Sequence, residues 1–236
     1  MKKLMTMAGM FAALMVLTAG ALAFAVAPAS ANGGGNGGAN GGANSGGWSI
    51  YYYNANGNSL GMSAKAGSGA TAAFPFLLPP RYAALLVTTG NSAVPTGNLT
   101  GHSLSDSFSI AGMSAGASFV GNPDQCYPGG SPPSARLYFA TGNKVSQYNL
   151  WWSTTPVALT WDGSGTLSAS LADPSQWSDL YGDNGGSTPT ATAQFYAATA
   201  NVSAVGVSFG AYCHAENGVT TSDGSGIFTS AFSVTP

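Results

Sequence analysis

Charged residues are scarce in this sequence. Its 236 residues include 6 Lys and Arg against 8 Asp and Glu, for a formal net charge of −2. Nucleic-acid binding requires clustered Lys and Arg that neutralise phosphates, and an anionic membrane surface attracts basic segments. The sequence therefore predicts no nucleic-acid partner, and contact with a membrane only through the N-terminal segment if that segment stays uncleaved.

Cysteine is nearly absent, with Cys126 and Cys213 as the two examples. In an oxidising compartment we expect a disulfide between them. In the chain-entropy model, a disulfide that closes a loop of this length stabilises the fold by about 4 to 5 kcal/mol. Two free thiols are the alternative. A zinc site is disfavoured because the two residues lack the close spacing of zinc ligands.

The first residues have the pattern of a secretory signal. Lys2 and Lys3 precede an apolar run over residues 4–26, and small residues follow up to Ala31. We expect a signal peptide over residues 1–31, cleaved after Ala31, and therefore a secreted, extracellular protein. An uncleaved membrane anchor is the alternative, because a run of this length can span a bilayer.

A segment rich in glycine and asparagine follows the signal. Residues 32–47 read NGGGNGGANGGANSGG and offer no side chain that can form a core. We expect a flexible linker there. The remaining residues, 48–236, have a length that is ordinary for a single β-sandwich domain.

Beyond the linker, apolar and polar residues alternate with a period of two, which predicts half-buried β-strands. The clearest examples are residues 103–110, 205–209 and 228–234. Residues 157–161 and 167–171 alternate likewise, and the turn sequence Asp162-Gly163-Ser164-Gly165 between them predicts a hairpin. Further strands are expected at residues 83–89, 117–120, 136–141 and 148–152.

Helices have little room in this pattern. Asp173-Pro174 can cap and start one turn that runs through Trp177, and residues 194–200 have helical spacing of apolar side chains. Short strands separated by regular turns are typical of a sandwich or jelly roll. The predicted fold is therefore all-β, an antiparallel, jelly-roll-like β-sandwich with one or two short surface helices.

The second half of the chain resembles a known group of folds. The likeness is carried by a strand at residues 136–141, Leu150-Trp151-Trp152-Ser153, Asp173-Pro174-Ser175-Gln176-Trp177 and residues 202–210, VSAVGVSFG. In this order, residues 136–235 resemble the jelly-roll modules grouped as galactose-binding-like and carbohydrate-binding domains. The resemblance implies a polysaccharide or cell-surface glycan as partner, and it assigns no ligand contacts residue by residue.

A second resemblance covers two short patterns, Asn122-Pro123-Asp124-Gln125-Cys126 and Glu216-Asn217-Gly218-Val219. Both are similar to patterns in secreted bacterial proteins. This likeness brings no activity with it.

Aromatic side chains are the candidate ligand contacts, because flat apolar rings with polar handles stack on pyranose sugars. We select Trp151, Trp152, Trp177 and Tyr181. Trp151 and Trp152 are adjacent, so in a strand they point to opposite faces. We expect one of them in the core and the other exposed or partly covered. Trp177 and Tyr181, in a loop with Asp179 and Asp183, are the better candidates for exposure.

Catalytic carboxylates are hard to identify. A glycoside hydrolase needs two of them with separated pKa values beside a cleft, whereas most of the 8 acidic residues lie in predicted turns. Asp106 is the exception, because it shares the apolar side of its strand with Phe108 and Ile110. It lies either in water at a strand end or buried with a partner, such as Arg81 or Arg136.

Other reactive patterns are weaker. Ser114 lies in Gly112-Met113-Ser114-Ala115-Gly116, but no strand followed by a long helix surrounds it. Cys213 adjoins His214, yet a cysteine in a disulfide has no thiolate to offer. We therefore predict no enzyme and no cofactor. Structural calcium at Asp124, Asp162 or Asp223 is an alternative without a loop of defined spacing to support it.

The leading hypothesis is a secreted, non-catalytic protein that binds a carbohydrate or a cell-surface component. A structural or self-associating surface protein is the alternative, because low charge, a linker and Ser- and Thr-rich strands favour association. A glycoside hydrolase ranks third.

Overall fold

A computed structural model describes residues 47–53, 60–122, 131–142, 146–212 and 217–236. The predicted signal segment, nearly all of the linker, Cys126 and Cys213 lie outside these ranges. Signal cleavage and the disulfide therefore stay predictions. The described residues form fourteen strands, one α-helix and one 3₁₀ turn.

In chain order the elements are β1 (Trp48–Tyr53), β2 (Leu60–Ser68), β3 (Thr71–Pro75), β4 (Tyr82–Thr88), β5 (Ser103–Ala111), β6 (Phe119–Gly121), β7 (Ser131–Thr141), β8 (Leu150–Ser153), β9 (Val157–Ala158), β10 (Ser164–Ser170), η1 (Pro174–Gln176), β11 (Trp177–Ser178), α1 (Pro189–Thr199), β12 (Val202–Tyr212), β13 (Val219–Thr221) and β14 (Ile227–Thr235).

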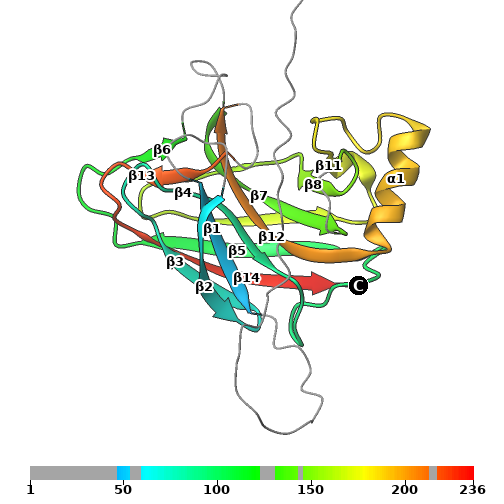
Figure 1. The fold of residues 1–236 in the computed structure, drawn as a ribbon, viewed down its shortest axis with the longest axis horizontal. Coiled ribbons are helices and arrows are strands. Elements are labelled where there is room, and N and C mark those ends of the chain that lie inside the picture. Colours follow the sequence, from blue (N-terminus) through cyan, green and yellow to red (C-terminus); the bar gives the residue numbers. More distant parts are fainter. Residues whose placement is uncertain (1–46, 54–59, 123–130, 143–145, 213–216) are drawn as a thin grey trace, which may run out of the picture.

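The fourteen strands belong to one antiparallel sheet. Its order is β10-β5-β14-β3-β2-β1-β4-β12-β7-β8-β11, with β13 paired to β4 and β6, and β9 paired to β7. β10, at one end of this order, lies close to β7 and β9 near the other end. The sheet therefore curls into a nearly closed, sandwich-like barrel (Figure 1). The prediction of an all-β antiparallel fold with short helical segments is confirmed.

Alternation along the strands fills the interior of the barrel. On β5 the inward residues Leu104, Phe108 and Ile110 are all buried. The Phe108 ring stacks on Phe228 of β14 with centroids 5.1 Å apart, and Phe228 meets Phe209 of β12 edge-on at 5.0 Å. Full burial of such side chains contributes about 1.5 to 3 kcal/mol each. This interior is therefore the main source of stability.

The helix packs at one end of the barrel, beside β8 and β11 (Figure 1). The Thr188 hydroxyl accepts the N–H of Ala191 at 3.0 Å and so caps the first turn of α1. Phe195 of α1 is buried, with its ring centroid 5.1 Å from that of Trp151 and 5.9 Å from that of Phe139. No helix in the described ranges is long and apolar enough to cross a membrane.

The hairpin predicted around residues 162–165 is wrong. β9 pairs with β7, whereas β10 pairs with β5. The turn itself forms, with Asp162 at φ 42°, but Trp161 lies in the turn and not in a strand. Residues 159–163 instead cross from the β7 side of the sheet to the β5 side. This short crossing holds the two sides close together.

Candidate functional site

Two of the predicted ligand contacts are core residues. Trp151 and Trp177 are each 0% exposed. Their indole N–H groups donate to the carbonyls of Tyr148 and Ser170, both at 2.9 Å. The expected exposure of Trp177 is wrong, because the residue begins β11, beside β8, and its ring packs edge-on against Phe139 at 4.9 Å.

Trp152 is also buried, on the other face of β8. It belongs to a second apolar cluster together with Tyr138, whose ring centroid lies 5.6 Å away. Leu180, from the loop after β11, packs against the same cluster. The two adjacent Trp residues do point to opposite faces, as predicted. The expectation that one of them is exposed is wrong, because both faces of β8 are covered.

Tyr181 is the one predicted contact that the structure leaves exposed, at 73%. It lies in a loop organised by the buried Asp179, whose Oδ1 accepts the N–H groups of Tyr181 at 2.9 Å and Asp183 at 3.0 Å. The Gln147 amide donates to Asp183 at 3.3 Å. These bonds fix the backbone of the loop. Tyr181 thus differs from the three tryptophans with which the sequence grouped it, because its ring is exposed and theirs are buried.

A different exposed ring lies at the other end of the barrel. Trp161 is 54% exposed, and its indole N–H donates to the carbonyl of Ser114 at 3.2 Å. The neighbouring Asp162 accepts the N–H of Met113 at 3.1 Å. Because the ring and the adjacent carboxylate both bind the Met113-Ser114 dipeptide, the indole is held in one orientation while much of its surface faces water.

A second carboxylate joins this arrangement. Asp223 Oδ1 accepts the N–H of Ser225 at 3.0 Å and its hydroxyl at 2.6 Å. The Ser225 hydroxyl in turn accepts the N–H of Ser114 at 2.9 Å. The hydrogen bonds from Ser225 hold the pKa of Asp223 below its usual value, so this carboxyl carries its charge in mildly acidic solution as well as at neutral pH.

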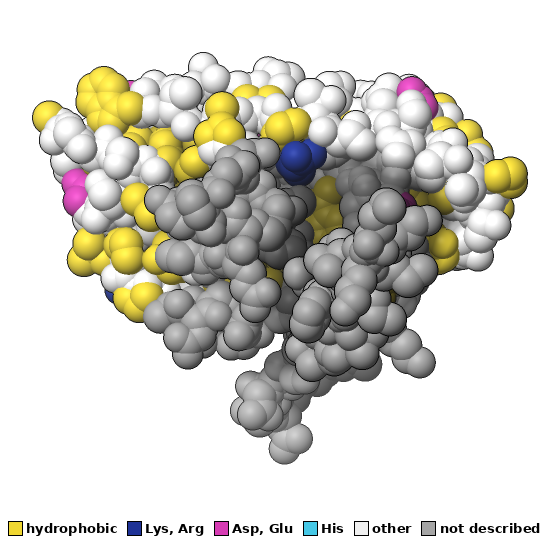
Figure 2. Space-filling model, turned by 90° about the horizontal axis from the view of Figure 1, so that it is seen from above, with side chains coloured by type: hydrophobic (Ala, Val, Ile, Leu, Met, Phe, Trp, Pro, Cys, Tyr) yellow, Lys and Arg dark blue, Asp and Glu magenta, His cyan; other side chains and the backbone are white. Residues whose placement is uncertain are grey.

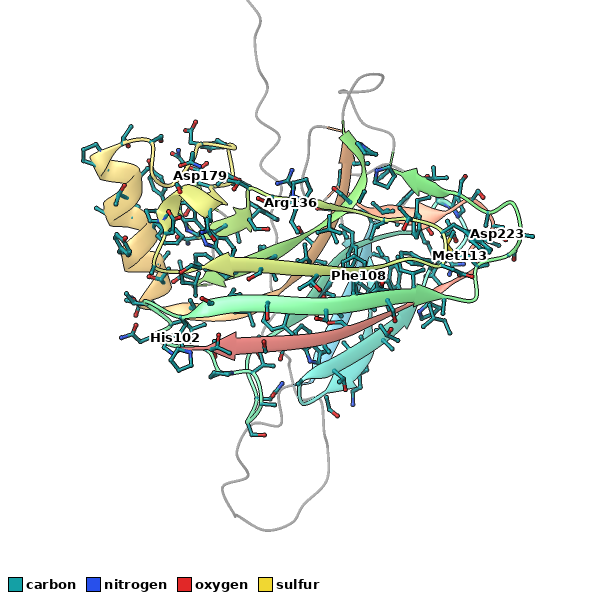
Figure 3. All side chains as sticks on the ribbon, turned by 180° about the vertical axis from the view of Figure 1, so that it is seen from behind. His102, Phe108, Met113, Arg136, Asp179 and Asp223 are labelled. Atoms are coloured by element: carbon teal, nitrogen blue, oxygen red, sulfur yellow. The ribbon has the colours of Figure 1, made fainter. Side chains whose placement is uncertain are left out.

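We call Met113, Ser114, Trp161, Asp162, Asp223 and Ser225 the Trp161 loop cluster. It is built from the turns after β5, before β10 and before β14. Met113 and Asp223 lie together at one end of the molecule, and Asp179 lies at the other (Figure 3). Figure 2 shows hydrophobic side chains beside acidic groups at the Trp161 end, on the left.

Sequence reasoning missed this cluster for a definite reason. Trp161 continues the alternation of Val157 and Leu159, so the pattern assigned its ring to the core. Leu159 is buried as that pattern predicts. The contrary signal was the turn sequence Asp162-Gly163, which ends the extended segment and turns the indole outward.

Asp106 has no role at an exposed site. The side chain is 0% exposed inside the barrel, and its Oδ1 accepts the Ser230 hydroxyl. Of the two alternatives for Asp106, burial with a partner is the one found, but the partner is Ser230 and not one of the suggested arginines: Arg136 donates to the carbonyls of Ser153 and Thr154, at 2.8 and 2.9 Å, and Arg81 is exposed. Burial raises the pKa of Asp106 to about 6, and the Ser230 hydrogen bond partly opposes the rise.

The remaining chemical candidates are distributed as follows. Ser114 lies in an exposed turn between β5 and β6, away from any helix. Of the three residues considered for calcium, Asp162 and Asp223 come together in the Trp161 loop cluster, whereas Asp124 lies outside the described residues, as does His214. Within the described ranges, no three His, Cys, Asp or Glu side chains gather as metal ligands.

Comparisons of the chain with protein-family models, with curated proteins and with solved structures gave no match.

Proposed function

We propose that this protein is a secreted, non-catalytic carbohydrate-binding protein that holds its ligand at the Trp161 loop cluster. The observation that carries the proposal is the Trp161 ring, 54% exposed although its N–H is already bonded to the protein. A pyranose stacks on such a face. Because the ring is held before the ligand arrives, binding costs little further side-chain entropy.

The surrounding groups support binding without hydrolysis. Sugar sites combine an apolar face with a few placed polar groups, and Asp162 and Asp223 supply carboxylate acceptors near the indole. A general acid at neutral pH needs a raised pKa, whereas that of Asp223 is lowered. Asp106, whose pKa is raised, lies inside the barrel. The likeness of residues 136–235 to carbohydrate-binding jelly rolls favours the same class.

The test is a binding screen with Trp161→Ala. Pull-down on a panel of insoluble polysaccharides, followed by calorimetry with soluble oligosaccharides of those that bind, should show affinity falling about tenfold or more in the variant, as for aromatic anchors that a bound partner covers. Tyr181→Ala removes an exposed ring at the opposite end and should bind like the wild type. Absence of wild-type binding across the panel, or equal losses in both variants, would refute the proposal.

Self-association is the second candidate, favoured by a regular surface. The outward residues of β10, β5 and β14 form a hydroxyl face that Figure 3 views directly. Register places Ser164, Ser109 and Thr229 in one row and Ser168, Ser105 and Ser233 in another. Hydroxyls hydrogen-bond across the strands at 2.7 Å between Ser109 and Thr229. No outward residue of these three described strands is charged, and charge is what usually discourages association of sheets.

The area of this hydroxyl face determines how strongly two copies of the protein are expected to associate. Two strands of 9 residues and one of 7, at about 3.4 Å per residue and about 4.8 Å apart, cover roughly 400 Å², below the ~800 Å² per partner of a standard stable interface. We therefore expect weak, concentration-dependent association between two copies. Sedimentation analysis should show it reduced in Ser107→Lys and kept in Ser222→Lys, an exposed turn residue outside the face. A wild-type protein that stays monomeric at high concentration would exclude this candidate.

A further inference from the structure

The Trp161 loop cluster carries negative charge that nothing in its immediate structure compensates. Asp162 accepts a backbone N–H, and Asp223 accepts a backbone N–H and a serine hydroxyl. These donors are neutral. In the described part of the chain, neither carboxylate pairs with Lys or Arg, so the indole lies beside two carboxylates that are open to a ligand's positive charge.

An exposed indole and nearby carboxylates attract the same kind of group. The face of a Trp ring binds cations better than any other aromatic side chain does. Carboxylates form charge-assisted hydrogen bonds with ammonium groups, which are roughly twice as strong as neutral ones. A neutral sugar would stack on the ring and donate hydroxyls to the carboxylates without offsetting their charge, and an acidic sugar would be repelled by Asp162 and Asp223. The chemistry therefore favours a cationic pyranose.

We propose that the site selects amino sugars that carry a free, protonated amine, as in a deacetylated polyglucosamine, over the N-acetylated form. The inference rests on the proposed carbohydrate-binding function and names its ligand class. Acetylation turns the ammonium into a neutral amide, which removes the positive charge and leaves the stacking face of the sugar in place. The two forms of one polymer thus isolate the contribution of charge.

The experiment compares glucosamine oligomers with N-acetylglucosamine oligomers of the same length by calorimetry on the folded protein. In mildly acidic buffer, where the amine is protonated and Asp223 is ionised, the deacetylated oligomer should bind about tenfold more tightly. The preference should shrink with added salt, because exposed charges are screened. It should also fall as rising pH deprotonates the amine.

Matched variants show whether the charge of Asp223 causes the preference for the deacetylated oligomer. Asp223→Asn keeps an acceptor for Ser225 and removes the charge, so the ratio of the two affinities should move toward one. Asp173→Asn is the control, because Asp173 accepts the N–H of Ser175 at 3.0 Å and its hydroxyl at 2.6 Å in the same local geometry, outside the cluster. This control should keep the wild-type ratio. Circular dichroism of both variants checks that they are folded.

The outcomes separate the two proposals. Equal wild-type affinity for both oligomers, with loss in Trp161→Ala, would overturn the amino-sugar inference and leave carbohydrate binding standing. No binding of either oligomer, nor of any neutral polysaccharide, would overturn both. A ratio unchanged in Asp223→Asn and in Asp162→Asn would assign the preference to another surface and so overturn the inference.

Discussion

A carboxyl group inside an apolar barrel is stable only if hydrogen bonds replace the water that it loses. Asp106 has the Ser230 hydroxyl on one oxygen, and among the described residues its Oδ2 has no hydrogen-bond partner. Its strand neighbours across the sheet, Leu167 and Phe232, are apolar. This imbalance explains why burial raises the pKa of Asp106 to about 6 from 3.8.

The raised pKa predicts that Asp106 destabilises the fold as pH rises. The folded state holds the proton more tightly than the unfolded state, so the stabilisation is complete below pH 3.8 and is lost as pH rises through about 6. A shift of this size corresponds to about 3 kcal/mol. Asp106→Asn should therefore be more stable than the wild type at pH 7, by up to about that amount. Urea unfolding at several pH values measures the difference.

The comparison with Asp106→Asn isolates this group from the other titrating carboxyls, because they are common to both proteins. The difference in the free energy of unfolding should be small in acid and grow across the window between the two pKa values. A difference independent of pH would show that Asp106 keeps an ordinary pKa in the folded protein.

At the scale of elements, alternation identified β5, β12 and β14, and the strands expected at residues 83–89 and 148–152 correspond to β4 and β8, which are buried nearly throughout. The predicted strand at residues 103–110 is β5, and the predicted turn capped by Asp173 is η1. β1 was missed because Trp48–Tyr53 reads WSIYYY, so its buried and half-buried positions alternate without a matching alternation of apolar and polar residues, and it also carries register shifts against β2 and β4. Sequence periodicity detects a face made of polar residues, whereas the half-buried face of β1 carries Tyr51 beside Ser49.

The N-terminal part of the helix was also missed. The prediction began at residue 194, whereas α1 begins at Pro189, after the Thr188 cap. The first turn is largely polar and exposed, so it lacked an apolar stripe to mark it. The burial of Trp151 and Trp177 followed from this packing of α1 against them, which is a long-range event that local spacing does not encode.

α1 packs against the barrel through Phe195, so removing this ring should destabilise the fold. Its ring packs edge-on against Trp151 at 5.1 Å and lies 6.4 Å from that of Trp177. Phe195→Ala should cost about 3 to 5 kcal/mol of unfolding free energy, and it should shift tryptophan fluorescence to the red as water reaches the two indoles. Gln194→Ala, at an exposed position of the same helix, should change little. Unaltered stability in Phe195→Ala would mean that the helix contributes no packing.

For the molecule as a whole, the main feature is the near closure of the sheet, which no local sequence pattern predicted. The turn before β10 was visible in the sequence, but the strands that it joins, β9 and β10, pair with β7 and with β5 respectively. They lie on opposite sides of the seam, the place where β10 meets β7 and β9. The turns that carry Met113, Trp161 and Asp223 follow β5 and precede β10 and β14, three strands that are neighbours in the sheet, so the strand order itself brings these turns to one end of the barrel. The Trp161 loop cluster is thus a product of topology, assembled from segments far apart in sequence.

Gly165 lies at this seam and tests how tightly it is packed. A Cβ at this position of β10 would lie 2.6 Å from Cζ of Phe108 and 2.8 Å from Cγ1 of Val157 on β9. The Phe108 ring is stacked on Phe228 and cannot move aside without disturbing the core. Gly165→Ala should therefore cost about 1 to 3 kcal/mol through overpacking, which lowers the melting temperature by about 2 to 4 °C per kcal/mol in a protein of this size.

Ser168→Ala, on the outward face of the same strand, supplies the control and should change stability by no more than about 0.5 kcal/mol. If the two variants melt together, β9 and β10 do not press against one another and the barrel is open at this seam. A lower melting temperature in Gly165→Ala, with weaker ligand binding as well, would connect closure to function, because the crossing at residues 159–163 positions Trp161 and leads directly into β10 and Gly165.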